Sequence, residues 1–368
     1  MNYEKLINER YQDTETYIPS LETMEALARR LGRPVDEISK LDSNENLFEV
    51  LPPVRLSLLS QPYNLYPDPS QLALRTAISK NIGIPLKHIV AGNGCAEMVD
   101  YICRLFLNDG EVAMVMRPTY GLFKFSARVA GARVVEVPLE AGFGVNVDWL
   151  KESMALHNPK VLFLVCPDNP SGMWHLNEVI IAAMDHDCIV VLDETYVEFS
   201  NHHSRVGWVT NHENLVVLRS FSKAVGLAGL RLGYGVFPRW MAKALWSIKM
   251  PADVTMAAQA AGVAALENWD MVEDRITAMK MLRTRMYEVL DRCPVLSPVR
   301  GSQANYILCQ CASHWDSRSM RLALESHGVL VRGYDDTDSG FGMGAYIRIT
   351  VGDKKAVDHL TRALEKIF

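Results

Sequence analysis

Short apolar runs alternate with helical patterns along most of the chain. Runs rich in valine, isoleucine and leucine predict buried strands at 89–91, 112–116, 160–165, 188–192 and 214–218, and two further strands at 329–332 and 346–352. Apolar residues at helical spacing predict helices at 21–31, with Ser20 as its N-cap, and at 70–81, 96–106, 239–249, 267–292 and 354–368. Strands that alternate with helices predict an α/β fold with a mixed, mostly parallel sheet.

Polar clusters follow four of the predicted strands. They are Gly92–Glu97, Asn169, Asp193 and Ser220–Lys223, and Arg231 opens the next strand. In open α/β sheets, ligands bind at the carboxyl ends of the strands, so clusters at these positions meet at one edge. Chance explains one such cluster, but four with complementary chemistry favour one ligand site over four structural turns.

The segment 217–234 reads VLRSFSKAVGLAGLRLGY and holds the most specific pattern. Lys223 follows the hydroxyls of Ser220 and Ser222, precedes a run of small residues, and has Arg231 eight positions after it. A lysine after a strand is usually a solvated surface charge. Hydroxyls, tight backbone and an arginine fork are instead what a phosphate dianion needs. A lysine held beside a phosphate pocket is what a Schiff-base cofactor needs.

The glycine-rich turn at 92–97 opens a predicted helix. Free backbone N–H groups and the positive end of the helix dipole make such a turn a phosphate cradle. A G-x-G pattern is weak evidence by itself, and Glu97 stands where the dinucleotide fingerprint has its third glycine or alanine. The turn therefore disfavours a nicotinamide-dependent dehydrogenase.

Composition and charge narrow the class of protein. A length of 368 residues suggests about two domains. A formal net charge of −5 gives no support for binding to nucleic acid or to a membrane surface, and no apolar run approaches the ~18 residues of a membrane span. The seven cysteines include no C-x-x-C pair, so neither a metal site nor a disulfide framework is predicted. With the polar N-terminal sequence, these features predict a cytoplasmic enzyme.

The motif S-x-S-K-x-x-x-x-x-G-x-R-x-G resembles the lysine segment of fold type I pyridoxal-phosphate enzymes. In detail it is similar to the histidinol-phosphate aminotransferase branch, and the resemblance runs from about Tyr17 to the end of the chain. It implies a large domain with a mostly parallel, seven-stranded sheet and a smaller α+β domain. The expected ranges are 1–46 for an N-terminal arm and part of the small domain, 47–265 for the large cofactor-binding domain, and 266–368 for the small C-terminal domain.

The resemblance implies pyridoxal 5'-phosphate as the cofactor and gives each cluster a role. Lys223 is expected to form the Schiff base and to act as general base. Asp193, which would be costly to bury unpaired, is expected to pair with the pyridine nitrogen. Tyr196 and Asn169 are expected to hydrogen-bond the 3′ oxygen of the ring, on which Tyr120 stacks. The implied phosphate-binding residues are Cys95 and Ala96 through their backbone N–H groups, Ser220, Ser222, Arg231, and Tyr66, which reaches across a homodimer interface.

The same resemblance implies a set of substrate contacts. The residues are Tyr17, Asn44, Asn169, Arg332 and Arg348. Asn44 belongs to the segment LDSNEN, which resembles the segment that lines the substrate side of the site, although Leu47 replaces its usual proline. An arginine on a strand is usually a solvated edge charge, but the planar forks of Arg332 and Arg348 suit a phosphate or carboxylate.

Two places depart from the family's pattern. Cys166 and Asp168 replace asparagines of the motif N-P-N-N-P-T/S-G, and we expect them to change the packing of the loop without removing the contact from Asn169. Ala252 and Asp253 stand where relatives usually have an aromatic residue and an asparagine near the substrate. The second departure leaves the identity of the substrate open.

The expected activity is transamination between L-histidinol phosphate and 2-oxoglutarate, which gives imidazole acetol phosphate and L-glutamate in histidine biosynthesis. An aminotransferase for another amino acid, aromatic or from a secondary pathway, stays open, as does a decarboxylase of the O-phosphothreonine type; the LDSNEN segment favours the aminotransferase. A cofactor-free binding or regulatory protein on the same fold is a further alternative, against which intact Lys223, Asp193 and Arg231 argue. Besides the small-molecule amino donor and 2-oxo acid, the expected partner is a second copy of the chain.

Overall fold

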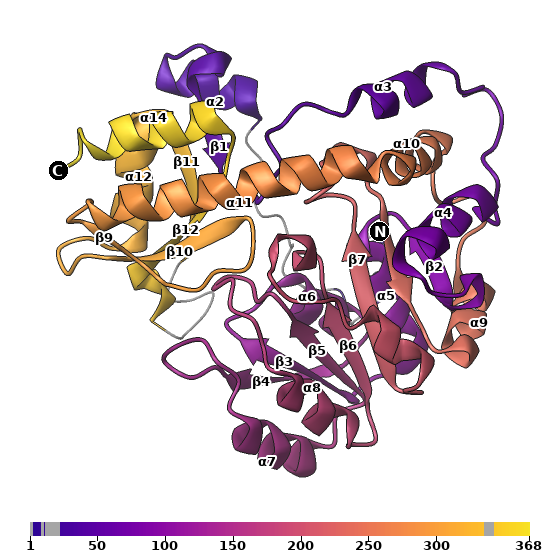
Figure 1. The fold of residues 1–368 in the computed structure, drawn as a ribbon. Coiled ribbons are helices and arrows are strands. Elements are labelled where there is room, and N and C mark those ends of the chain that lie inside the picture. The colour runs from indigo at the N-terminus through magenta and orange to yellow at the C-terminus, as the bar shows by residue number, and fades with distance from the viewer. Residues whose placement is uncertain (1–2, 9–10, 12–22, 335–341) are drawn as a thin grey trace.

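Two sheets organise the part of the chain that the computed structural model describes, which is residues 3–8, 11, 23–334 and 342–368 (Figure 1). One sheet has seven strands and the other has five. The long helix α11 (Trp269–Asp291) leads from the region of the larger sheet to that of the smaller one.

The seven-stranded sheet has the order β2-β8-β7-β6-β5-β3-β4. Its neighbouring strands are parallel except where β8 pairs antiparallel with β2 and β7, so the prediction of a mostly parallel sheet is confirmed. The strands are β2 (Ile89–Gly92), β3 (Val112–Arg117), β4 (Arg133–Pro138), β5 (Val161–Val165), β6 (Ile189–Asp193), β7 (Leu215–Ser220) and β8 (Gly233–Val236).

Burial explains which of these strands could be predicted. The central strand β5 reads VLFLV and is buried at every position, because helices cover both faces of a parallel sheet. The five strands predicted in this region are present, with ends that differ by at most two residues. Strand β4, at one edge of the sheet, was not predicted, since five of its six residues are partly buried or exposed.

Helices pack on both faces of the larger sheet. Helices α5, α6 and α9 share one apolar cluster with the sheet, in which the rings of Phe123 and Phe163 stack with centroids 4.8 Å apart. Helices α3, α4, α7, α8 and α10 contribute to the cluster on the other face. The helices other than α11 are α2 (Met24–Leu31), α3 (Pro52–Leu59), α4 (Leu72–Ile82), α5 (Cys95–Phe106), α6 (Leu122–Val129), α7 (Val147–His157), α8 (Asn177–Met184), α9 (Arg239–Ile248), α10 (Met256–Glu267), α12 (Ser317–Ser326) and α14 (Lys354–Leu364).

The predicted helices are present, with differences at their ends. The N-cap of α2 is Thr23, whose hydroxyl accepts a hydrogen bond from the backbone N–H of Ala26 at 3.2 Å, whereas the predicted cap Ser20 lies outside the described residues. The helix predicted at 267–292 begins at Trp269 because Asn268, with φ −120°, separates it from α10. The last helix ends at Leu364.

The five-stranded sheet has the order β1-β11-β12-β10-β9. Its apolar face packs against α11, α12 and α14. Strand β1 pairs in parallel with β11, so a segment from the first 46 residues shares this sheet with strands from the last hundred. The strands are β1 (Ser39–Leu41), β9 (Leu296–Pro298), β10 (Tyr306–Cys311), β11 (Val329–Gly333) and β12 (Tyr346–Thr350). The exact domain ranges stay a prediction.

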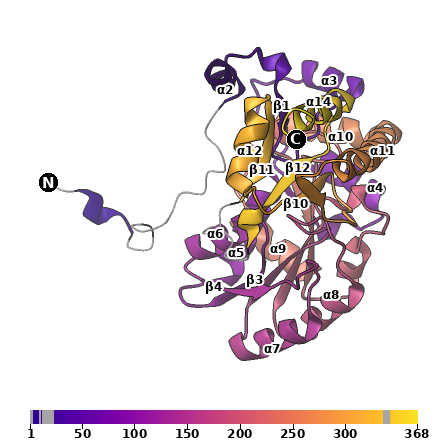
Figure 2. The same cartoon turned by 90° about the vertical axis from the view of Figure 1, so that its left-hand side faces the viewer.

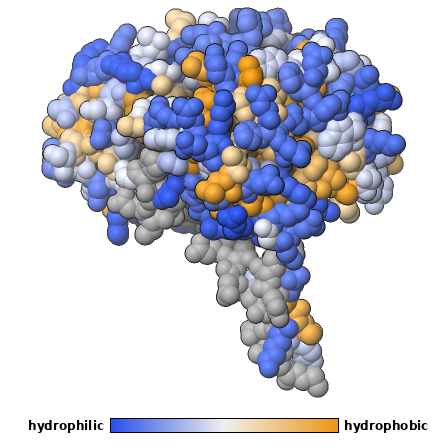
Figure 3. Space-filling model, turned by 90° about the horizontal axis from the view of Figure 1, so that it is seen from below, coloured by the Kyte–Doolittle hydropathy of each residue, from blue (hydrophilic) through white to orange (hydrophobic). Residues whose placement is uncertain are grey.

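The surface is mostly hydrophilic on the face seen in Figure 3, with hydrophobic groups between the polar ones. The short helix η1 (Tyr3–Leu6) lies away from the body of the molecule (Figure 2), and its Tyr3 and Leu6 side chains are exposed. Among the described helices, none combines the length and the apolar character that crossing a membrane requires.

Candidate active site

At the N-terminus of α5, the backbone of the turn that precedes the helix packs closely against the Arg231 side chain and strand β8. Gly94, the N-cap, has φ +79°, and a Cβ built on it would lie 2.8 Å from Nη2 of Arg231. A Cβ built on Gly233 in β8 would lie 2.6 Å from the backbone nitrogen of Cys95. Only glycine fits both positions, so the turn before α5, strand β8 and the Arg231 side chain lie against one another.

The cradle at this helix end offers backbone donors. An α-helix provides no intrahelical acceptor for the N–H groups of its first turn, and Cys95 and Ala96 are its first two residues. The Cys95 thiol donates a hydrogen bond to the carbonyl of Arg219 at 3.1 Å, and burial raises the pKa of that thiol. The thiol is therefore neutral and turned towards the backbone, which leaves the N–H groups available for an anion; their binding of a phosphate stays a prediction.

Strand β7 and the residues after it bring hydroxyls and charges to the same place. β7 ends at Ser220, whose hydroxyl accepts a hydrogen bond from the Ser222 backbone N–H at 3.0 Å. The side chains of Ser220 and Arg231 both interact with the Cys95 side chain. The backbone of Cys95 and Ala96 and the side chains of Ser220, Ser222 and Arg231 thus lie around one helix N-terminus, a ready-made anion site.

Lys223 lies beside this cradle with its amine directed at the LDSNEN segment. Its Nζ donates a hydrogen bond to the main-chain carbonyl of Ser43 at 3.0 Å. Burial, together with the nearby cations Arg348 and Arg231, lowers the pKa of Lys223 to about 8, and Glu45 opposes the shift. A lysine in this state supplies neutral amine near physiological pH, which a nucleophile or a general base requires.

Asp193 is buried at the end of β6 with one oxygen anchored. Oδ1 accepts hydrogen bonds from the backbone N–H of Thr195 at 2.9 Å and from its hydroxyl at 2.5 Å. Burial raises the pKa of Asp193, and the nearby Lys223 cation opposes the shift. Because both hydrogen bonds from described residues end on Oδ1, Oδ2 remains for a ligand. Sequence reasoning missed Thr195, although a hydroxyl two residues after an aspartate is typical of a local turn.

Tyr196 is held from the LDSNEN segment by Asn44. The Asn44 amide donates to the Tyr196 hydroxyl at 3.1 Å, and its Oδ1 accepts from the Thr350 hydroxyl at 3.2 Å. The Asn44 backbone N–H and carbonyl are also bonded, to Thr350 and Asn305. Asn44 is only 1 % exposed and positions Tyr196 through its amide, while its contact with a substrate stays a prediction.

The same segment clamps the loop that carries the lysine. The Asn46 amide donates to the main-chain carbonyls of Lys223 at 3.0 Å and Ala224 at 3.1 Å. Together with the Ser43 carbonyl on the lysine amine, these bonds fix both ends of the Lys223 residue. Sequence reasoning placed this segment on the substrate side but did not foresee that it holds the lysine loop.

Arg332 and Arg348 lie side by side because β11 and β12 pair in antiparallel register with these two residues opposite each other. Nη1 of Arg348 donates to Oδ1 of Asn169 and Nη2 donates to the carbonyl of Asp42, both at 2.7 Å. Nε of Arg348 is buried and has no acceptor among the described residues. Arg348 is only 8 % exposed, so a buried cation with an unused donor faces Lys223 and Asn169.

The two departures in the loop after β5 are used within that loop. Asp168 accepts hydrogen bonds on Oδ2 from the Ser171 hydroxyl at 2.5 Å and backbone N–H at 3.2 Å, and burial raises the pKa of Asp168 to about 7. The Cys166 sulfur accepts from Nη1 of Arg205 at 3.1 Å. Both side chains contribute to the packing of the loop, and Asn169 accepts a hydrogen bond from Arg348, while the contact of Asn169 with a cofactor stays a prediction.

The departure at Ala252–Asp253 creates a buried ion pair. Asp253 pairs with Lys249, and the two side chains are 5 % and 1 % exposed. Asp253 also accepts a hydrogen bond from the Gln71 amide at 3.1 Å, and its main-chain carbonyl accepts from the Asn93 amide at 2.9 Å. Asn93 belongs to the turn that precedes α5, so the pair anchors the back of the phosphate cradle.

Three predicted aromatic contacts have different outcomes. Tyr66 is 92 % exposed, so no other described part of its own chain covers it. Tyr120 lies before α6 and its ring meets Phe123 edge-on, with centroids 5.6 Å apart, while its own side chain stays 37 % exposed. Tyr17 lies outside the described residues. The roles of Tyr66 and Tyr120 towards a cofactor stay predictions.

The residues that the structure brings together fit pyridoxal phosphate. A cradle that any Cβ would fill is ready for the phosphate, an amine of lowered pKa is ready for the aldehyde, and a buried carboxyl with a spare oxygen is ready for the pyridine nitrogen. The buried, unpaired Nε of Arg348 marks where an acidic group of a substrate would bind.

Comparison with known proteins agrees with this geometry. The family model for aminotransferase class I and II matches residues 36–364. Histidinol-phosphate aminotransferase, chloroplastic, of Nicotiana tabacum is 38% identical over 346 residues, which are 94% of this chain and 82% of that protein. Histidinol-phosphate aminotransferase of Roseiflexus castenholzii is 36% identical over 361 residues, which are 96% of this chain and 95% of that protein.

A solved structure extends the agreement to the fold. The crystal structure of histidinol-phosphate aminotransferase from Sinorhizobium meliloti in complex with pyridoxal-5'-phosphate matches with a TM-score of 0.85 at 24% identity, covering 98% of this chain and 99% of that one. The fold type I architecture expected from the lysine motif is thereby confirmed. The chain belongs to the aminotransferase class I and II family.

Proposed function

We propose that the protein is a pyridoxal-phosphate-dependent aminotransferase that converts L-histidinol phosphate and 2-oxoglutarate into imidazole acetol phosphate and L-glutamate. The observation that carries the enzyme class is the convergence of Lys223, Asp193 and the glycine–arginine cradle on one site. The substrate rests on the curated relatives, which are named histidinol-phosphate aminotransferases and align over nearly the whole chain. The two adjacent arginines, Arg332 and Arg348, favour a substrate that carries a doubly charged acidic group.

Different residues of the protein bind different parts of the cofactor. The N–H groups at the start of α5, the serine hydroxyls of β7 and Arg231 bind the phosphate. Asp193 holds the proton on the ring nitrogen, because its spare oxygen is buried and the anchored one is fixed by Thr195. When bound, pyridoxal phosphate supplies the electron-withdrawing ring that stores the electron pair of the substrate Cα–H bond.

Lys223 and the arginines act on the substrate. The neutral amine of Lys223 takes the proton from the substrate Cα, which its lowered pKa permits near neutral pH. Arg348 and Arg332 bind the acidic group, and the hydrogen bond of Arg348 to Asn169 sets the angle of the guanidinium. The clamp from Asn46 keeps the lysine backbone in place while the amine moves.

The working unit that we propose is a cytoplasmic homodimer. Tyr66 is 92 % exposed on a loop held by Pro67 and Pro69, which supports a contact with a second copy of the chain rather than with its own. The seven cysteines are all unpaired, in keeping with a reducing compartment. Analytical ultracentrifugation of the wild type and of Tyr66→Ala tests the dimer, and cell fractionation tests the location.

The experiment that tests the activity is a spectrum of the purified protein with added pyridoxal phosphate. L-Histidinol phosphate is then added without any oxo acid, and loss of the visible cofactor band is expected. L-Histidinol, which lacks the phosphate, is the matched donor, and we expect it to act far more slowly because the arginines lose their partner. A band that ignores histidinol phosphate but responds to another amino acid would refute the substrate.

Two variants distinguish the chemical role of Lys223 from a general effect on folding. Lys223→Ala is expected to bind the cofactor without the visible band and to lose transamination. Lys243→Ala removes an exposed lysine of α9 and is expected to behave as the wild type. Equal spectra for the two variants would contradict the role of Lys223.

A further inference from the structure

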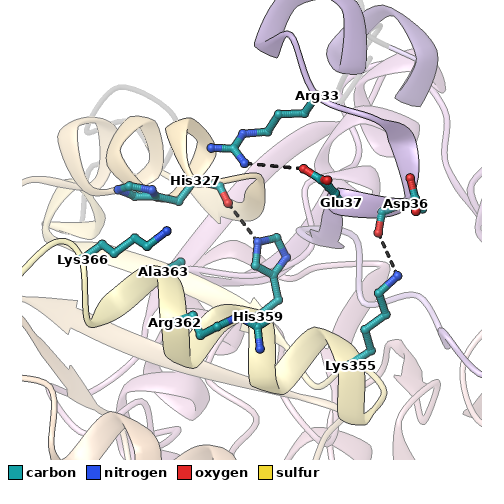
Figure 4. A pocket seen from close by; sticks show the side chains of 9 residues that line it. All are labelled: Arg33, Asp36, Glu37, His327, Lys355, His359, Arg362, Ala363 and Lys366. Atoms are coloured by element: carbon teal, nitrogen blue, oxygen red, sulfur yellow. Dashed lines mark hydrogen bonds and ion pairs between the residues drawn. The ribbon is translucent and has the colours of Figure 1, made fainter.

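A charged pocket lies on the outside of the smaller sheet, away from the active-site residues. It has a volume of about 300 Å³ and lies between α14, the C-terminal end of α12 and the short helix η2 (Val35–Glu37) (Figure 4). It shares no residue with the active site described above, and its existence does not depend on the proposed function. We call it the α14 pocket.

One side of α14 supplies the largest part of its lining. Lys355, His359 and Arg362 follow one another at intervals of four and three residues, so they lie on the same side of the helix, and Lys366 comes from the turn after the helix ends. Arg33, which follows the end of α2, comes from the opposite wall. Figure 4 shows the Lys366 amine, the Arg33 guanidinium and the His359 ring around the same space.

The pocket is positive although the protein is acidic. Four lining side chains carry a positive charge, while Asp36 and Glu37 carry the only two carboxylates, which gives a formal net charge of +2 within a chain of −5. Glu37 lies at the edge of ion-pair range, 4.0 Å from Nη1 of Arg33, and its side chain is 58% exposed. The carboxylates therefore do not neutralise the cations, because exposed pairs at such distances are weak.

Several donors in the pocket are unused by the protein. Within the described part of the chain, the side chains of Arg362 and Lys366 make neither a hydrogen bond nor an ion pair, and both are exposed. Lys355 donates once, to the main-chain carbonyl of Asp36 at 2.8 Å, and keeps two hydrogens free. Arg33 donates to the carbonyl of Ser326 at 3.1 Å. The pocket thus holds an excess of cationic donors over acceptors.

His359 reports the electrostatic potential of the pocket. Its Nε2 lies 3.0 Å from the carbonyl of His327, which can only accept, so Nε2 donates, and Nδ1 lies 2.9 Å from the Ser39 hydroxyl. Burial lowers the pKa of His359, the cations Arg362, Arg33 and Lys355 lower it further, and the bond to His327 opposes them. The other titratable groups that line the same space are Asp36, Glu37, His327 and Lys366.

We propose that the α14 pocket is a binding site for a phosphate group, either free inorganic phosphate or the phosphate of a small phosphorylated molecule. A dianion would use the free donors of Arg362, Lys366 and Lys355 and offset the mutual repulsion of the cations. A volume of about 300 Å³ lies at the lower end of the range for small-molecule sites, so the ligand body is small.

The test follows His359 by NMR in the holoenzyme, in which the cofactor already fills the active-site phosphate cradle. The His359 signal is assigned by its loss in His359→Gln. Inorganic phosphate, AMP or sodium chloride is added at equal ionic strength, and the pH titration is repeated. Phosphate is expected to raise the pKa of His359 more than chloride does, because a bound dianion stabilises the charged ring whereas chloride only screens.

Matched variants decide whether the α14 pocket is responsible. Arg362→Gln combined with Lys366→Gln is expected to weaken the response to phosphate about tenfold or more, since two charge-assisted donors are lost. Lys354→Gln removes a charge from an exposed position of the same helix outside the pocket and is expected to leave the response unchanged. Both sets of positions are exposed, and circular dichroism checks that the variants fold.

The results of this titration distinguish free phosphate from a phosphorylated molecule as the ligand, and they either support or overturn the proposed site. Equal affinity for inorganic phosphate and AMP assigns the site to free phosphate, and tighter binding of AMP assigns it to a phosphorylated molecule. An effect of phosphate no larger than that of chloride, or one that persists in the double variant, would overturn the proposal. Failure of the aminotransferase assay would leave this result untouched, because the variants and the readout lie outside the active site.

Discussion

The lowered pKa of Lys223 gives a measurable rate advantage to the protein over free lysine. A pKa of about 8 in place of 10.5 leaves about 300 times more neutral amine at neutral pH. Only the neutral amine attacks the cofactor aldehyde. We therefore expect the rate of cofactor capture by the apoenzyme to rise with pH and to level off above about pH 8, where the lysine is already deprotonated.

The perturbation that tests the cause is Arg348→Gln. Among the charges that act on Lys223, Arg348 lowers its pKa most, ahead of Arg231 and Lys40. Removing this cation should raise the pKa of Lys223, so the rate of cofactor capture should reach its plateau at a higher pH. Arg332→Gln is the matched control, because Arg332 stands opposite Arg348 in the sheet but is not among those charges.

The assay mixes apoenzyme with pyridoxal phosphate in a stopped-flow instrument and follows the visible band at a series of pH values. A small lysine amide measured under the same conditions corrects for the ionisation of the cofactor itself. A capture rate that rises without a break to about pH 10, as for free lysine, would refute the argument from burial and charge. Equal profiles for Arg348→Gln and Arg332→Gln would refute the assignment of the cation.

Three further predictions concern the loops behind the site. Gly233→Ala is expected to weaken cofactor binding, because its Cβ would meet the turn backbone at 2.6 Å, whereas Gly229→Ala has open space and should bind as the wild type in a fluorescence titration. Asp168→Asn should raise the melting temperature at about pH 8 but much less at about pH 4. The pKa of Asp168 in the folded protein, about 7, lies above its ordinary value of 3.8, so the stability that the protonated carboxyl contributes is present at low pH and is lost as the pH rises through 7. Asp253→Ala should lower the free energy of unfolding in urea by about 3–5 kcal/mol, because it leaves the Lys249 ammonium buried without a partner. Adding Lys249→Met should restore part of that free energy, whereas an additive loss would argue against the ion pair.

Local sequence pattern was enough to predict that the polar clusters of the candidate site lie at one edge of the larger sheet. Lys223, Asp193 and the glycine turn each follow a short apolar strand, and parallel strands place their carboxyl ends at one edge whatever the details of packing. The strands of the large sheet were predictable for a related reason, since burial on both faces demands uninterrupted apolar runs. Strand β4 was not predicted because five of its six residues are partly buried or exposed, whereas β2 at the opposite edge is buried throughout.

Tertiary structure alone decided which distant residues meet. Asn44 was predicted only as a substrate contact, and its pairing with Tyr196 and Thr350, which lie 152 and 306 residues from it in sequence, shows that it also positions Tyr196. The buried pair of Lys249 and Asp253 shows the same limit, because no local pattern reveals that these charges are removed from water. The α14 pocket joins residues 33–37 to residues 355–366. Short-range periodicity encodes the elements, whereas register and burial arise only when the elements pack.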